Sequence, residues 1–538
     1  MGGGGGFMPG IATRPISSKA VLEVLRELAP PILLMALFVI TGLRGRDFGH
    51  HWDEVEWQLQ PVRLMVERGN WMPPAEIYPG MARWLVLLPA LPAGLAGLVS
   101  GNGFRAALAT ALARPDYLIE ARSLFIVVSS LAILWVYLAA RAFERPVWES
   151  TAAAAGLALS WEYAYHARWL ATDCIVVEFA ALMLYMLGRF RRDGRRRFLY
   201  GAAVAAGLAM GTKYPAGMLL VPLWLSGGLT LPPRPVLAQV TRFLLLGTVA
   251  SVAYLVTSPA TLVDIPKFAE RIYWIEVAYE RANAGYAVHS AWQHLRVVLA
   301  YFGLTFFSPY RIVALLLFIS AGCGVVAWWR KDYRTALALV SLPVSFLLVF
   351  TNQYRTVVMR NYLFLSPFFA LFMARGLGWV AAQAHGRRPI LGLGALLLAA
   401  IGIAHAGWLV VGGESIRRAS PESEVKDAFA YVASHASTTF RLSPGVVALG
   451  QKLGLTLPPN AQDPSAGKPS ANVDAFVLFA RAEGPSPFTI PSNDPFLTLA
   501  VFGPREVNFN WYASWTGADR VIVMSRAKAR RAGVALAQ

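Results

Sequence analysis

Long apolar runs separated by short polar segments dominate the first 412 residues of the chain. The first run predicts a helix at about 28–45, and a polar, aromatic stretch follows it. A bilayer core about 30 Å thick needs roughly 20 mostly apolar residues per helix, so runs of this kind predict membrane-spanning helices. Further runs fall near 82–98, 121–140, 150–166, 172–190, 198–211, 214–231, 242–258, 311–329, 335–351, 360–378 and 390–412.

The segment 82–116 is ambiguous, because it could cross the membrane once or twice with Gly101 to Gly103 as the turn. Cytoplasmic loops of membrane proteins are rich in Lys and Arg, which helps to decide. A further crossing near 100–116 places three basic segments in the cytoplasm together: 189–197, 329–334 and Arg387-Arg388. The expected fold is therefore a polytopic α-helical membrane protein with about thirteen transmembrane helices, its N-terminus inside and its C-terminus outside.

This orientation divides the chain into three regions. Residues 1–27 form a cytoplasmic tail, and residues 28–412 form the transmembrane domain with two large outward loops, 46–81 and 259–296. From about Gly413 the composition becomes polar, with short alternating runs at 475–479 and 520–524. Such runs are typical of strands, so 413–538 is expected to be a small α/β extracytoplasmic domain.

Composition agrees with a membrane protein, since 56% of the residues are hydrophobic and only 15% are charged. A net charge of +18 would suit nucleic-acid binding, but the arginines cluster in short loops between apolar runs. That is the pattern of a cytoplasmic membrane face, so no nucleic-acid partner is expected. Cys174 and Cys323 lie inside apolar runs without paired spacing, which indicates neither a disulfide framework nor a thiolate metal site.

An acidic pair follows the first expected span, in the sequence His50-His51-Trp52-Asp53-Glu54-Val55-Glu56-Trp57. A carboxylate held beside a membrane-embedded pocket can accept a proton from an acceptor hydroxyl as that oxygen attacks. Taken alone, an Asp-Glu pair in a loop is more often a pair of ordinary solvated residues. The motifs that accompany it therefore decide its meaning.

With this pair the chain resembles the extracytoplasmic glycosyltransferases of the GT-C fold, which use a polyprenyl-phosphate-linked sugar. The protein O-mannosyltransferases and the aminoarabinose transferases of lipid A are branches of that superfamily. Its first outward loop opens with an Asp-Glu pair and an aromatic residue three positions later, matched here by Asp53, Glu54 and Trp57. The family usually has tyrosine at the aromatic position, so Trp57 is a departure. Ile77-Tyr78-Pro79-Gly80 stands where the family has a Tyr-Pro or Lys-Pro-Pro element, without the lysine of the aminoarabinose transferases.

Two further elements follow in the family's order. Tyr165-His166-Ala167-Arg168-Trp169-Leu170-Ala171-Thr172-Asp173 is similar to its Arg-x-x-x-x-Asp corner. Ionisable residues at membrane depth are usually functional, although Asp173 also suits the cap of the next helix. Gly207-Leu208-Ala209-Met210-Gly211-Thr212-Lys213-Tyr214-Pro215 is similar to the family's Gly-Leu-Ala-x-x-Thr-Lys turn. There Lys213 would either neutralise a lipid phosphate or snorkel to the membrane interface.

Two last elements complete the resemblance. Thr257-Ser258-Pro259, with Asp264 and Phe268, is similar to the opening of a long outward loop in the family, which would be a lid over the lipid carrier or an amphipathic face on the membrane. Met359-Arg360-Asn361-Tyr362-Leu363, with Pro367, resembles an Arg-Tyr-Leu-x-x-x-x-Pro helix start. Arg360 would pair with phosphate through its planar fork.

The resemblance implies transfer of a sugar whose phosphate leaving group is stabilised by a cationic pocket. Asp53 would deprotonate the acceptor hydroxyl, which displaces the lipid phosphate in one inverting step. Glu54 and Asp173 would be the other catalytic residues and orient acceptor, sugar or base. The substrate-binding residues would be Trp57, Tyr78, Arg168, Lys213, Tyr214, Arg360 and Tyr362.

The partners implied are a polyprenyl-phosphate-linked sugar donor, a lipid, glycan or protein acceptor, and membrane lipids. The composition, rich in Ala, Leu and Arg, favours a bacterium, hence an undecaprenyl carrier and the inner (plasma) membrane. No His and Cys cluster has ligand spacing, so no transition-metal site is expected. Some relatives use a divalent cation, and two carboxylates such as Asp53 and Asp173 have the chemistry to hold one.

Two other classes of protein stay open at this point. A secondary transporter or lipid flippase also places charged side chains in the membrane, but usually near its midplane and in two related halves. Here the charged residues fall at outward helix ends, and the sequence shows no internal repeat. A noncatalytic scaffold with a partner-binding outer domain is the third class.

Overall fold

The computed structural model describes most of the helical region and part of the C-terminal region. The described residues are 18–46, 54–72, 78–114, 116–229, 235–275, 288–353, 357–384, 388–418, 421–462, 473–480, 498–502 and 520–527.

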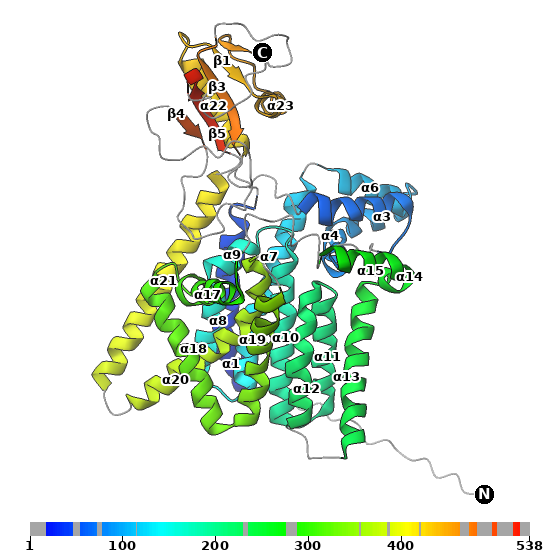
Figure 1. Ribbon diagram of the computed structural model, residues 1–538, viewed down its shortest axis with the longest axis vertical. Helices are drawn as coiled ribbons and strands as arrows, with labels where there is room; N and C mark the ends of the chain where they lie inside the picture. The colour runs from blue at the N-terminus through cyan, green and yellow to red at the C-terminus, as the bar shows by residue number, and fades with distance from the viewer. Residues whose placement is uncertain are drawn as a thin grey trace, which may run out of the picture.

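A bundle of long helices forms the body of the molecule (Figure 1). Eight stretches of the described chain are helices long and apolar enough to cross a membrane: Leu25–Leu43, Met81–Val99, Tyr117–Ala142, Val236–Thr257, Arg311–Lys331, Tyr333–Gln353, Met359–Gln383 and Gly392–Glu414. More polar or shorter helices run alongside them, namely α8 (Val147–Ala158), α10 (Thr172–Asp193), α11 (Arg196–Met210) and α12 (Leu220–Leu229). The expectation of a polytopic membrane protein is confirmed.

Close helix contacts in the bundle depend on small residues. Helix α18 (Arg311–Lys331) packs against α20 (Ser366–Gln383) where Gly324 faces the backbone of Phe372, and Gly376 faces the backbone of Ser320. A side chain at either glycine would overlap a carbonyl oxygen of the other helix. Small residues that let helix backbones approach are typical of helix association in membranes.

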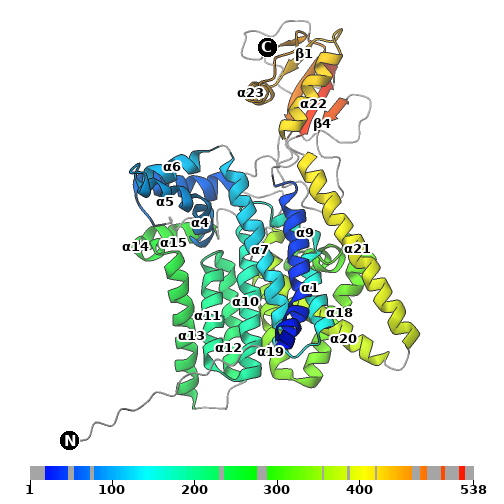
Figure 2. The same ribbon diagram turned by 180° about the vertical axis from the view of Figure 1, so that it is seen from behind.

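The segment 82–116 differs from the expected pair of membrane crossings. It forms α4 (Met81–Leu87), a 3-10 turn η2 (Leu88–Ala90), α5 (Leu91–Val99) and α6 (Phe104–Ala113). Helix α6 has ten residues, which is about 15 Å and half of a hydrocarbon core. Figures 1 and 2 show α6 beside α3 (Gln60–Arg68), across one end of the bundle. The crossing expected near 100–116 is therefore wrong, because this helix is too short.

The second long loop also forms helices at this end of the bundle. After α13 (Val236–Thr257) come α14 (Ala260–Val263) and α15 (Ile265–Tyr273), and α17 (Ala291–Tyr301) follows later. The carboxylate of Asp264 caps α15 by accepting a hydrogen bond from the Lys267 amide at 3.1 Å. Both views show α14 and α15 near the layer made by α3 and α6 (Figures 1 and 2).

The C-terminal region is a small α/β unit beyond α21 (Arg388–Arg418). It contains α22 (Pro421–Ser434), β1 (Phe440–Leu442), α23 (Pro444–Lys452), β2 (Ala461–Gln462), β3 (Ala475–Ala480), β4 (Thr498–Phe502) and β5 (Arg520–Ser525). The sheet order is β2-β1-β3-β5-β4, with β1 parallel to both neighbours and β5 antiparallel to both of its own. The strands expected at 475–479 and 520–524 are confirmed as β3 and β5.

Candidate active site

Three of the sequence elements meet at the end of the bundle where α3, α6 and α15 lie. The amide of Gly80 donates to Ser258 Oγ at 2.8 Å, and the amide of Met81 donates to the Gly211 carbonyl at 2.8 Å. The indole of Trp84 donates to the Thr257 carbonyl at 3.1 Å. These bonds join the elements at 77–80, 207–215 and 257–259, which are far apart in the sequence.

Beside this junction lies a partly buried cation held by two oxygen atoms. Lys213 Nζ is 2.5 Å from Asp173 Oδ1 and 2.6 Å from Asn361 Oδ1. The side chain of Asp173 is 3% exposed and that of Lys213 is 14% exposed, so this ion pair is largely shielded from water. Asp173 lies in the first turn of α10, where the helix dipole also favours a carboxylate. The two predicted residues Asp173 and Lys213 are therefore direct partners.

A second cation approaches the same carboxylate from another element. Arg360 lies in the 3-10 helix η7 (Met359–Leu365) and places its guanidinium 5.5 Å from the ring centroid of Trp169. Its positive charge acts on Asp173, as does that of Lys213. His166 is fully buried and packs with its ring centroid 5.4 Å from that of Trp169. Two cations and one carboxylate give this cluster a net positive charge, which suits a phosphate ligand.

The 3-10 helix η7 explains how three consecutive side chains reach three different elements. A 3-10 helix has three residues per turn, so neighbouring side chains diverge by about 120°. Arg360 lies over Trp169, Asn361 reaches Lys213, and the hydroxyl of Tyr362 lies 2.5 Å from His294 Nε2 on α17. Asn361 was absent from the predicted site, since its role depends on this local geometry.

Glu54 lies in a buried ion pair rather than in an open loop. Arg122 Nε and Nη2 donate to the two carboxylate oxygens at 2.9 and 2.5 Å, and both side chains are 1% exposed. The amide of Leu170 donates to Glu54 Oε1 at 2.9 Å, and Arg122 also donates to the Arg46 carbonyl at 2.8 Å. Glu54 thus connects the first loop to α7 (Tyr117–Ala142) and to the corner at 165–173. Arg122 was absent from the predicted site, although a single arginine near the start of an apolar run could have indicated it.

Arg168, expected to receive phosphate, instead contacts the end of α1 (Ser18–Leu43). It is fully buried, and its guanidinium donates to the carbonyl of Thr41 at 2.9 Å and to that of Ala164. Its guanidinium carbon also lies 5.2 Å from the ring centroid of Trp161. These contacts are those of a cation capping a helix C-terminus. These hydrogen bonds therefore direct the Arg168 guanidinium toward the end of α1.

The remaining predicted residues surround the junction or fall outside it. Tyr214 packs edge-on against Phe268 of α15, with ring centroids 5.8 Å apart. Trp57 and Tyr78 are half-buried, and the carbonyl of Trp57 accepts a hydrogen bond from Arg83 at 3.4 Å. Asp53, the expected base, lies outside the described residues, one position before Glu54.

No group of three or more His, Cys, Asp or Glu side chains able to hold a metal ion occurs within the described ranges. Within those ranges, Asp173 faces an ammonium and Glu54 faces a guanidinium. Each of these two carboxylates thus has a cationic side chain as a partner.

Comparison with known proteins gives one family match. Residues 103–262 match the model of the dolichyl-phosphate-mannose-protein mannosyltransferase family, a range that includes the elements at 165–173 and 207–215 and the start of the element at 257–268. No curated protein sequence matches the chain.

Two solved structures from different organisms are similar to this chain. ArnT from Cupriavidus metallidurans bound to undecaprenyl phosphate shares 14% identity, with 94% of this chain and 98% of that chain covered and a TM-score of 0.45. The Archaeoglobus fulgidus oligosaccharyltransferase AglB, in complex with an inhibitory peptide and a dolichol-phosphate, shares 13% identity, with 85% and 70% covered and a TM-score of 0.43. The family match confirms the resemblance predicted from the motifs, to the GT-C fold glycosyltransferase superfamily.

Proposed function

We propose that this protein is a membrane glycosyltransferase that moves a sugar from a polyprenyl-phosphate carrier to a hydroxyl group of a lipid, glycan or protein on the extracytoplasmic face. The observation that carries the proposal is the buried Lys213–Asp173 pair with Arg360 beside it. It lies where three elements in the family's order meet. The family match over 103–262, whose description names a dolichyl-phosphate sugar donor, supports the same donor class.

The chemistry requires stabilisation of a departing phosphate. The bond from the sugar C1 to the phosphate oxygen breaks while a bond from C1 to the acceptor oxygen forms, with inversion at C1. Lys213 and Arg360 would stabilise the negative charge that grows on the phosphate, from positions fixed before the reaction begins. Asp173 and Asn361 would hold the Lys213 ammonium in place at 2.5 and 2.6 Å.

The proton on the acceptor hydroxyl also needs a base. Asp53 has the chemistry for this, and it precedes Glu54, whose carboxylate is fixed by Arg122 and the Leu170 amide. In this proposal Glu54 positions the loop rather than contacting the sugar. A bacterial host would supply undecaprenyl phosphate as the carrier.

The test is transfer of a radiolabelled sugar from a panel of synthetic polyprenyl-phosphate sugars to a membrane extract. Wild-type protein should transfer label, and Asp53→Asn and Asp173→Asn should reduce transfer by at least about 100-fold, as expected for loss of a general base or of electrostatic support. Asp193→Asn is the matched control, because Asp193 ends the same helix at the opposite end of the bundle. It should retain wild-type transfer.

The rival transporter function predicts a different outcome. Wild-type protein would then transfer no label from any donor in the panel, yet it would move a small solute or a lipid across a vesicle membrane. In that case the charged cluster at Lys213 would mark a transport pathway. Equal transfer by wild type and Asp173→Asn would refute the assigned site while leaving the enzyme class intact.

A further inference from the structure

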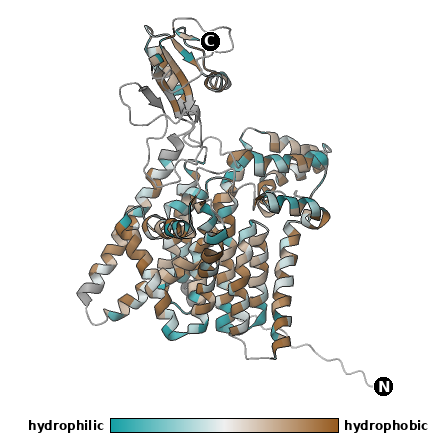
Figure 3. Ribbon diagram, in the orientation of Figure 1, coloured by the Kyte–Doolittle hydropathy of each residue, from teal (hydrophilic) through white to brown (hydrophobic). Residues whose placement is uncertain are grey.

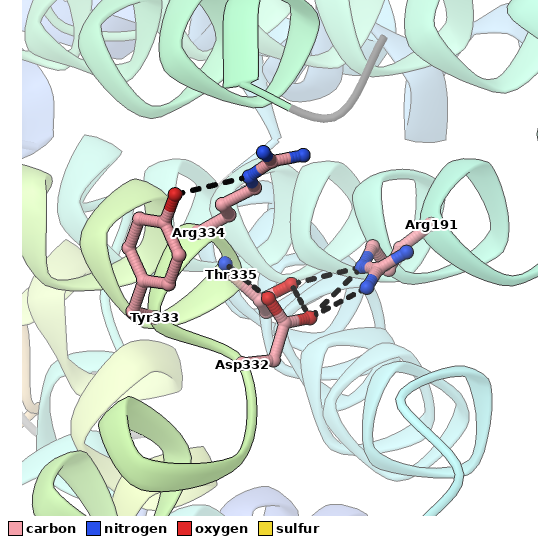
Figure 4. A network of polar contacts seen from close by, with 5 residues as sticks. All are labelled: Arg191, Asp332, Tyr333, Arg334 and Thr335. Carbon is pink, nitrogen blue, oxygen red and sulfur yellow. Dashed lines mark hydrogen bonds and ion pairs between the residues drawn. The ribbon is translucent and has the colours of Figure 1, made fainter. Parts of the chain in front are cut away.

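The end of the bundle opposite the candidate active site contains a polar network between two helix pairs. Arg191, near the end of α10, donates to Asp332 Oδ2 at 3.0 and 2.7 Å and to Thr335 Oγ1 at 3.1 Å (Figure 4). Asp332 lies in the turn between α18 and α19 (Tyr333–Gln353) and accepts from the Thr335 hydroxyl at 2.7 Å. The network fixes the turn against α10.

A pocket lies next to this network. It is a small recess lined by Phe143, Leu187, Phe190, Arg191, Ser226, Thr335, Ala338 and Leu339. Five of these eight residues are apolar, and the polar ones include Arg191, which is 48% exposed. The pocket therefore combines an apolar lining with an accessible guanidinium.

Basic residues surround the pocket. The segment 189–197 contains six arginines and one aspartate, and the segment 330–334 contains three basic residues and one aspartate, so together they have a net charge of +7. Arg195, Arg196 and Arg197 are exposed. Figure 3 shows hydrophilic residues at this lower end of the bundle, below the hydrophobic helices.

Aromatic side chains accompany the charges. Trp329 is 50% exposed and Tyr333 is 52% exposed. Arg334 lies with its guanidinium carbon 5.8 Å from the Tyr333 ring centroid. Exposed Trp and Tyr next to Lys and Arg mark the level of the lipid headgroups in membrane proteins.

We propose that this basic end of the bundle, formed by 189–197 and 330–334 with the adjoining pocket, binds an anionic phospholipid. The headgroup phosphate lies among the exposed arginines, at the level marked by Trp329 and Tyr333. Basic pockets between transmembrane helices suit anionic headgroups, because attraction by several cations adds up near the surface. The site is separate from the candidate active site and does not depend on the proposed function.

The experiment uses the full-length protein in nanodiscs of phosphatidylcholine, with or without phosphatidylglycerol. Native mass spectrometry counts the lipids of each kind that stay bound. Wild-type protein should retain phosphatidylglycerol in preference to phosphatidylcholine, and added salt should weaken this preference. The triple substitution Arg195→Gln, Arg196→Gln and Arg197→Gln should reduce the preference by about tenfold.

A matched control removes the same charge from the other end of the molecule. Arg68, Arg105 and Lys267 are exposed there, and their joint replacement by Gln should leave the preference unchanged. If the triple arginine variant does not fold, Arg192→Gln alone provides the test with a smaller expected loss. No preference in wild type, or an equal loss in the two charge-matched variants, would overturn the proposal.

Discussion

Arg122→Met offers the most direct test of the buried ion pair that holds the first loop. Both side chains of the Glu54–Arg122 pair are 1% exposed, so water cannot compensate a lone charge there. Removing one partner of a buried ion pair typically costs about 3–5 kcal/mol. We therefore expect the variant to lose several kcal/mol of stability, because the buried Glu54 carboxylate loses both hydrogen bonds from the Arg122 guanidinium.

The double substitution Glu54→Gln with Arg122→Met should be less destabilised than the sum of the two single substitutions. Neither buried charge remains in the double variant, so the largest electrostatic cost disappears. The surface pair Arg114–Glu120, with side chains 46% and 39% exposed, is the control. Arg114→Gln should cost at most about 1 kcal/mol.

The assay is the fraction of detergent-solubilised protein that still elutes as a folded species after heating to a series of temperatures. Arg122→Met should elute as unfolded at clearly lower temperatures than wild type, and Arg114→Gln should not. Wild-type stability of Arg122→Met, or strict additivity in the double variant, would show that the ion pair does not hold the loop.

Three further predictions follow from single contacts. Asn361→Ala should lower kcat about tenfold with little change in KM, because one hydrogen bond to the Lys213 ammonium is lost. A hydrogen bond to a charged group is worth about 1.5–3 kcal/mol. A rise in KM alone would contradict the positioning role of Asn361. Burial alone would raise the pKa of Asp332, but hydrogen bonds from Thr335 and Arg191 outweigh it and hold the pKa below its ordinary value. Its stabilising effect is therefore complete above pH about 4 and is lost as the pH falls through the lowered pKa, so Asp332→Asn should be less stable than wild type at neutral pH and approach it in acid. Gly324→Ala should destabilise the contact of α18 with α20 by about 1–3 kcal/mol. Gly322→Ala on the same helix has open space at its Cβ and should leave the stability unchanged. Equal melting temperatures of the two variants would argue against this close contact.

Much of the membrane fold could be predicted from local patterns. An apolar run long enough for the bilayer must form a helix, because hydrocarbon offers no partner for free backbone groups. The segment 82–116 was the exception, because its hydropathy does not show that the second helix has only ten residues and lies across the bundle end (Figure 1). Hydropathy alone does not separate this arrangement from a membrane crossing.

Local patterns in the chain predicted the class of protein, most of its helices, the small α/β unit and the order of the family motifs. They also indicated Asp173, Lys213 and Arg360 as site residues, because charges at helix ends in an apolar chain stand out. Which of these residues meet depends on how the helices pack. Lys213 contacts one residue 40 positions away and another 148 positions away, and Arg168, close to Asp173 in sequence, points to the end of α1 instead. The physical reason is that side-chain partners depend on helix packing and on the local rotation of each backbone segment, neither of which is encoded in hydrophobic periodicity.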